Sequence, residues 1–173
     1  MGETINNILI GTANIADAAI TAPKLGKTCD FSVVGFSDAS GVQVDITGAT
    51  KTYAAGDLKV GDVIVVDIAL LLNDASATRV YLYLDSQLAC STQAAYAAAT
   101  TGGTSMVRLH VVSATKVLYS QYQFYGATTN QVFAEGVITV SDISANAIIL
   151  KAQHKATNAT NYSSVMATRT KGT

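Results

Sequence analysis

The side chains that could do chemistry in this chain are few and scattered. The two histidines, His110 and His154, lie in separate apolar segments without a cysteine or carboxylate at metal-ligand spacing, so we expect partly exposed structural side chains. Ten aspartates stand against two glutamates, but aspartates such as Asp57 and Asp62 fall between apolar runs, where turns favour this residue. The sequence contains no nucleophile elbow, phosphate-binding loop or calcium-binding loop. We therefore expect no catalytic residue, no metal site and no cofactor, and a protein that is not an enzyme.

The composition narrows the classes of partner. The 173 residues carry a formal net charge of −1 and only 13% charged residues, which is no footprint for nucleic acid. The mean hydropathy of +0.31 is high for a small soluble monomer, yet no apolar run reaches membrane-spanning length. The first residues do not read as a secretory signal. We expect neither nucleic acid nor a membrane as partner, and we infer that apolar surface is buried between subunits.

The two cysteines, Cys29 and Cys90, lie far apart in the sequence and form no CxxC motif. A chain with a large core does not need a disulfide, and unpaired cysteines are among the most buried residues. We expect two buried free thiols, with pairing left open.

From Phe31 onward the chain alternates apolar and polar residues in short segments rich in β-branched and aromatic residues. Clusters of Gly, Asp, Asn, Ser and Thr separate these segments. The pattern predicts an all-β domain over residues 29–173, an antiparallel sandwich or barrel of roughly eight to ten strands. One segment, residues 91–103, reads instead as a short helix between strands.

The segment 62–72 is apolar on both faces of its predicted strand. A two-layer sandwich has one core, so one of these faces requires a second cover, either a helix of the chain or a neighbouring subunit. The face that contains the only interruption, an aspartate, gives the candidate subunit interface: Val65, Asp67, Ala69 and Leu71. Asp67 either pairs with a basic group such as Arg108 at that contact or is an ordinary strand-edge aspartate.

Other polar and aromatic side chains share strand faces and are candidates for surface recognition. Tyrosine offers a rigid contact area with a polar tip. The residues are Tyr81, Tyr83, Arg108, His110, Tyr119 and Tyr125.

Residues 1–28 differ from the rest and form a candidate arm, either helical or extended. An alternating spacing of three and four residues would make a narrow helical seam, which Gly11 weakens; its members are Ile5, Ile8, Thr12, Ile15 and Ala19. A helix of this length is marginal alone in water, so either form of the arm requires a partner.

The arm contains Ile15, Asp17, Ala19, Ile20, Thr21, Lys24 and Leu25, and this pattern resembles a connector element near the start of many bacteriophage tail-fibre and appendage proteins. The resemblance implies attachment to a capsid or tail. The attachment residues would be Ile5, Ile8, Ile15, Asp17, Ile20, Thr21, Lys24 and Leu25. The element occurs once and Pro23 stands where the family usually has alanine or threonine, which favours a short anchor over a repeated shaft.

The closing segment, from "GVITVSDISANAIILKAQH" to "YSSVMATRT", is similar to the last strands of jelly-roll heads of the tumour necrosis factor type. This resemblance implies an antiparallel jelly-roll sandwich that closes at a threefold axis.

Together these observations give the hypothesis of a non-enzymatic bacteriophage structural protein, a homotrimeric fibre, spike or decoration protein. It would be made in the host cytoplasm and assembled into the virion. Its partners would be other virion proteins of the capsid or tail and, for the projecting head, a host-surface glycan or protein. The alternative is a carbohydrate-binding β-sandwich module that stacks sugars on Tyr81, Tyr83, Tyr119 or Tyr125, against which the absence of tryptophan argues.

Overall fold

The computed structural model describes residues 26–36, 41–71, 79–91, 102–125, 131–155 and 162–172. Within these ranges the chain forms strands and turns, and no helix there has the length and hydropathy to cross a membrane. The expected arm up to residue 25 lies outside the described residues. Most of the expected helix of residues 91–103 does so too, while its ends belong to strands, Ser91 at the end of one and Gly102 and Gly103 at the start of the next.

The described residues form ten strands, which pair antiparallel. They are β1 (Lys27–Val34), β2 (Val44–Tyr53), β3 (Val63–Leu71), β4 (Arg79–Leu84), β5 (Gln87–Ser91), β6 (Gly102–Ser113), β7 (Lys116–Tyr125), β8 (Gln131–Thr139), β9 (Ile148–Lys155) and β10 (Tyr162–Thr170).

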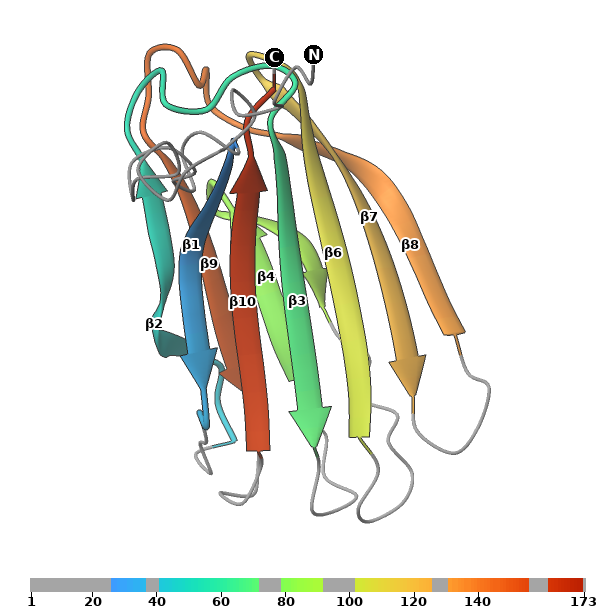
Figure 1. Ribbon diagram of the computed structural model, residues 1–173. Helices are drawn as coiled ribbons and strands as arrows, with labels where there is room; N and C mark the ends of the chain where they lie inside the picture. Colours follow the sequence, from blue (N-terminus) through green and yellow to red (C-terminus); the bar gives the residue numbers. More distant parts are fainter. Residues whose placement is uncertain are drawn as a thin grey trace, which may run out of the picture.

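The strands form two sheets that pack face to face. A six-stranded sheet has the order β1-β10-β3-β6-β7-β8, and a four-stranded sheet has the order β2-β9-β4-β5. Figure 1 shows the six-stranded sheet in front, from β1 on the left to β8 on the right, with the other sheet behind it. The prediction of an all-β antiparallel sandwich is confirmed.

The strand order is that of a jelly roll with one addition. Without β7 and β8, the two sheets read β1-β10-β3-β6 and β2-β9-β4-β5. The connections from β1 to β2, from β3 to β4 and from β9 to β10 cross between the sheets, as in an eight-stranded jelly roll. The β7–β8 hairpin extends the first sheet at its β6 edge. The predicted jelly roll is therefore present, and it carries an added hairpin on one side.

The core lies between the inward faces of the two sheets. In β6, Val107, Leu109 and Val111 are buried while Arg108 and His110 are exposed, so this strand has the one-sided pattern that alternation predicts. Across the core the four-stranded sheet contributes fully buried side chains such as Leu82 and Leu150. Each such side chain stabilises the fold by about 1.5–3 kcal/mol relative to an exposed position.

A buried arginine ties the two sheets together near the C-terminus. Arg169 of β10 is 5% exposed, and its Nη1 lies 3.3 Å from Asp57 Oδ1 and 3.9 Å from Asp62 Oδ2. Its guanidinium stacks 5.1 Å from the ring centre of Tyr53 on β2. Asp57 and Asp62 do lie between strands, as their sequence positions suggested, and they also neutralise this buried charge.

The two cysteines are free and lie in different environments. Cys90 is buried, as predicted, and burial raises the pKa of its thiol to about 12. Cys29 is exposed, so the prediction for it was wrong: the register of β1 shifts between Cys29 and Phe31, and of these two residues only Phe31 is buried. The prediction for His154 was also wrong, because the inward face of β9 buries it and stacks it on Phe36.

Candidate functional site

The outward face of the six-stranded sheet is unusually apolar. One row of paired positions crosses the whole sheet, from Ser32 of β1 through Met166, Asp67, Met106 and Tyr122 to Phe133 of β8. Met106 and Tyr122 are each 39% exposed and Phe133 is 62% exposed. Monomeric proteins rarely leave contiguous apolar patches of this kind open to water. The sheet therefore presents a surface suited to a partner.

The outward side of β3 is part of this surface. Val65 is half-buried, while Asp67 and Ala69 are exposed; Leu71 ends the strand, and its side chain lies outside the described residues. Asp67 pairs in register with Met106 and Met166, and no ion pair joins it to Arg108. The second face of β3 thus lies open on the described part of the chain, and Asp67 stands on it between two methionines.

A groove of about 490 Å³ runs over this part of the sheet. We call it the docking groove. Its outward side chains include Val34, Asp67, Ala69, Met106, Phe124 and Met166. Four of its strands, β1, β10, β3 and β6, belong to the jelly roll proper.

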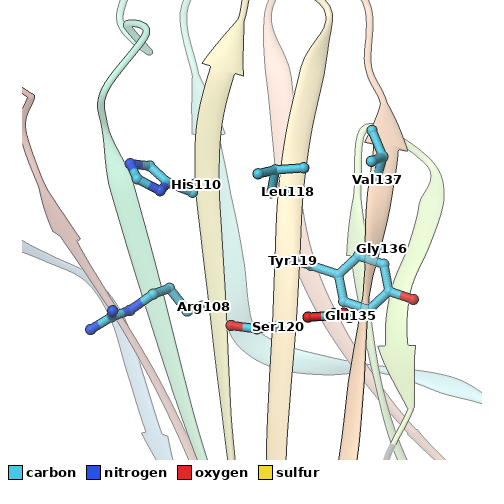
Figure 2. A pocket seen from close by; sticks show the side chains of 8 residues that line it. All are labelled: Arg108, His110, Leu118, Tyr119, Ser120, Glu135, Gly136 and Val137. Carbon is cyan, nitrogen blue, oxygen red and sulfur yellow. The ribbon is translucent and has the colours of Figure 1, made fainter.

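A second depression lies over the added hairpin (Figure 2). It consists of a hollow of about 490 Å³ and a smaller one of about 310 Å³, which share Ser120 and Glu135. We call it the hairpin trough. Its outward side chains are Arg108, His110, Leu118, Ser120, Tyr122, Phe133, Glu135 and Val137.

The strand register places the polar side chains of the trough in one row across three strands. Arg108, Ser120 and Glu135 pair across β6, β7 and β8, so a hydroxyl lies between a cation and an anion. Two strand spacings put the Arg108 and Glu135 backbones roughly 10 Å apart. Neither of these two side chains forms an ion pair within the described ranges. In Figure 2 Arg108 extends toward β3, on the side of the trough opposite Glu135.

The apolar groups of the trough lie on either side of this polar row. His110, Leu118 and Val137 form the row on one side. On the other side the rings of Tyr122 and Phe133 meet edge to face, with centres 5.2 Å apart. Such an edge-to-face aromatic pair is a stable, rigid platform.

Tyr119 lines the larger hollow of the trough from the inward side of β7, and its role in surface recognition stays a prediction. It shares the inward face of β7 with Gln121 and Gln123, and it packs half-buried against the core. A Cβ at Gly136, its partner on β8, would lie 2.7 Å from the Tyr119 ring, so the glycine makes room for the tyrosine. Tyr125 has the same parity as Tyr119, and its side chain lies outside the described residues.

Tyr81 and Tyr83 lie on the other side of the molecule, on the outward face of the four-stranded sheet. Both are half-buried, and the Tyr83 hydroxyl accepts a 2.7 Å hydrogen bond from the Gln43 amide. A polar network continues from Gln43 to Gln153, which donates to Asp45. The structure therefore separates these tyrosines from Arg108 and His110, which share one face of β6.

The hydrogen bond from Gln153 and the ion pair with Lys151, at 3.1 Å, hold the pKa of Asp45 below its ordinary value. The network around Asp45 thus holds the Asp45 carboxylate and the Lys151 ammonium together, but it does not enclose a ligand site. Among the described residues no three His, Cys, Asp or Glu side chains group as a metal site would require.

The sequence reading missed Tyr122, Phe133 and Glu135. The parity of residues 116–125 carries the signal, because Leu118, Tyr122 and Phe124 share one face of β7 and two glutamines share the other. The usual rule would bury the apolar face, whereas the structure buries the glutamines: Gln121 Nε2 donates to Ser105 Oγ at 3.1 Å and to the Ser91 carbonyl at 3.3 Å.

Comparison with known proteins gives likenesses of structure only. No model of a known protein family matches the sequence, and no curated protein matches it either. Arcelin-5, a lectin-like defence protein of Phaseolus vulgaris, is similar over 86% of this chain and 100% of its own, with TM-score 0.49 and 5% identity.

Two further solved structures share less. The CBM2 module of the evolved Dit of Lactobacillus casei BL23 phage J-1 is similar over 86% of this chain and 91% of its own, with TM-score 0.39 and 10% identity. The VP2 subviral particle of infectious bursal disease virus has TM-score 0.33 and 12% identity over 84% of this chain, which spans 31% of that protein. All three TM-scores lie below 0.5, so these likenesses assign no function to the chain.

Proposed function

We propose that this chain is a non-enzymatic structural protein of a bacteriophage virion, a homotrimer whose subunits pack through the docking groove. The observation that carries the proposal is the open apolar face of the six-stranded sheet, on which Met106, Phe124 and Met166 are 38–50% exposed. Burial between subunits would stabilise the assembly by roughly 25 cal/mol per Å² of apolar surface. Val65, Asp67, Ala69 and Leu71 of β3 would lie at this contact.

The arm supplies the virion part of the proposal. Residues 15–25 resemble the phage connector element, and the described chain begins at Gly26, one residue before β1. An arm on the edge strand of the sandwich would dock on a capsid or tail protein while the sandwich projects outward. The virion is therefore the proposed location, and other virion proteins are the proposed partners.

Light-scattering mass on the full chain and on a chain that begins at Gly26 tests this proposal. Two trimers, the first near three times 17.9 kDa, would support assembly through the sandwich and leave the arm available for attachment. A full chain that is monomeric at micromolar concentration would contradict the proposal. A trimer for the full chain alone would make the arm the clasp and refute assembly through the groove.

The second candidate function is a carbohydrate-binding module that uses Tyr81 and Tyr83. The hydrogen bond from Gln43 to Tyr83 favours it, because a ring held in place loses little side-chain entropy on binding. A glycan array probed with the full chain and with the double variant Tyr81→Ala/Tyr83→Ala tests it. Binding that the double variant abolishes would establish this function, and unchanged binding would exclude these tyrosines.

A further inference from the structure

The β7–β8 hairpin is an addition to the jelly roll, and large apolar side chains lie on its outward face while two glutamines lie on its inward face beside the buried Val117 and Ile138. Leu118, Tyr122 and Phe124 of β7 point outward, while Gln121 and Gln123 of the same strand are buried. Phe133 and Val137 of β8 are 62% and 59% exposed. The core of the eight-stranded fold does not require these outward side chains, so their apolar character calls for a contact outside the chain.

The shape and charge of this surface favour a small polar ligand over a flat protein face. The centre of the trough is Ser120, a small residue with larger side chains around it, so the surface is hollow there. The hollow volumes of about 490 and 310 Å³ lie in the range of small-molecule sites, roughly 300–1,000 Å³. From Leu118 to Tyr122 the trough runs four residues along β7, roughly 13 Å, which suits a short oligomer.

The chemistry of the lining matches a saccharide. A sugar ring has an apolar face of C–H groups, for which Tyr122 and Phe133 offer an aromatic platform at one end and Leu118 and Val137 an aliphatic one at the other. The same ring has a rim of hydroxyl groups. The Ser120 hydroxyl can donate a hydrogen bond to these groups or accept one from them, and the Glu135 carboxylate can accept one.

The cationic side of the trough specifies the charge of the ligand. Arg108 has no ion-pair partner among the described residues, and His110 lies beside it on the same face of β6. A guanidinium binds a carboxylate through two parallel hydrogen bonds, which the hydroxyls of a neutral sugar do not replace. Glu135, about two strand spacings away, repels a second negative group at the other side of the trough.

We propose that the hairpin trough is a binding site for an acidic oligosaccharide that carries a uronate-type carboxylate. The carboxylate binds Arg108, the hydroxyls of the central sugar bind Ser120 and Glu135, and one ring stacks on Tyr122 and Phe133. The inference rests on the proposed function in that subunits assemble through the docking groove and leave the trough open, so that the projecting head contacts a host-surface glycan.

The test is an array of glucuronate-containing tetrasaccharides, each printed beside the same tetrasaccharide with its carboxylates reduced to alcohols. The full chain is probed as wild type, as Arg108→Gln, as Phe133→Ser and as the matched control Ile149→Ser, which lies outward on the other sheet. We expect binding to the acidic member of a pair, a loss of about tenfold or more in Arg108→Gln and Phe133→Ser, and no change in Ile149→Ser.

The other outcomes contradict the inference in distinguishable ways. Equal binding to acidic and reduced members refutes the carboxylate at Arg108. If both trough variants still bind, the trough is not the binding site. If the wild-type chain has the light-scattering mass of a trimer and binds none of the glycans, the trough is also refuted, but the proposed function stands. A wild-type chain that binds as a monomer keeps the trough and refutes the trimer.

Discussion

The outward faces of the two sheets differ, although both enclose the same core. The four-stranded sheet presents half-buried tyrosines, Gln153 and Lys151, and its polar groups bond to one another around Asp45. The six-stranded sheet presents methionines, aromatic residues and few charges, and Asp67, Arg108 and Glu135 form no ion pair there within the described ranges. On the four-stranded sheet the polar side chains bond to one another. On the described part of the six-stranded sheet, apolar side chains and charges without an ion pair remain open to a partner.

Whether the polar groups of an exposed sheet face bond to one another distinguishes a face that meets water from a face that meets a partner. A sheet face that meets only water can close its hydrogen bonds within itself, as the Gln43–Asp45 network does. A face that keeps Met106 and Phe133 exposed gains free energy when a partner covers it.

The same positive charge placed on each of the two faces should have very different effects on assembly. Met106→Lys places an ammonium in the docking groove, where it would be buried in an assembly, while Ile149→Lys places one on the four-stranded sheet at 45% exposure. We expect Met106→Lys to reduce the trimer to a monomer and Ile149→Lys to leave the trimer intact, as measured by light scattering. Equal effects of the two variants would show that the faces do not differ in this way.

Arg169 allows the joint between the sheets to be weakened without altering either outward face. Arg169→Ala leaves Asp62, which is 1% exposed, without its cationic neighbour. We expect a loss of roughly 3 kcal/mol in the free energy of unfolding by urea, because breaking a buried pair strands the other charge. The folded variant should keep the oligomeric mass of the wild type; a variant as stable as the wild type would show that hydrogen bonds from Lys59 and Gly172 already satisfy Asp62.

The reactivities of the two thiols report the difference between an exposed and a buried position. At pH 8 we expect iodoacetamide to modify Cys29 and to leave Cys90 unmodified, with rates at least about 100-fold apart, since only the thiolate reacts. Burial, together with a pKa of about 12, protects Cys90. Mass spectrometry of the native chain measures both rates, and comparable rates would place Cys90 outside the core; a urea-unfolded sample is the control in which both should react.

The smallest effect concerns the polar face. The pKa of Asp45 is lowered in the folded chain, so its contribution to stability is present above its unfolded value, about 3.9, and is lost as the pH falls through the folded value. Asp45 is well exposed, so we expect the contribution to remain under about 1 kcal/mol. An NMR titration of its carboxyl carbon should show Gln153→Ala moving the pKa upward; no movement would contradict the hydrogen bond as its cause.

The sequence alone predicts the sandwich well, for a physical reason. Alternation in segments such as residues 105–113 assigns Val107, Leu109 and Val111 to one face, and the structure buries all three. Residues 62–72 are apolar on both strand faces, and this pattern also indicated the exposed face of the sheet. Ile64 and Val66 fill the core, whereas Ala69 lies on the opposite face and is exposed.

Alternation within single segments could not predict the hairpin trough, because the trough depends on which strands pair and in which register. Tyr122 and Phe133 meet only when β7 pairs with β8, and Arg108 and Glu135 share a row only through Ser120. The alternation rule also misleads in β7, where a buried glutamine pair takes the place of apolar residues. Residues 1–25 of the expected arm lie outside the described residues.

Sedimentation equilibrium of the unmodified full chain across a dilution series tests most simply whether the docking groove of the six-stranded sheet is a subunit interface. We expect a mass of three times 17.9 kDa at micromolar concentration, which Met106→Lys lowers to 17.9 kDa. A wild-type mass of 17.9 kDa at every concentration would contradict it.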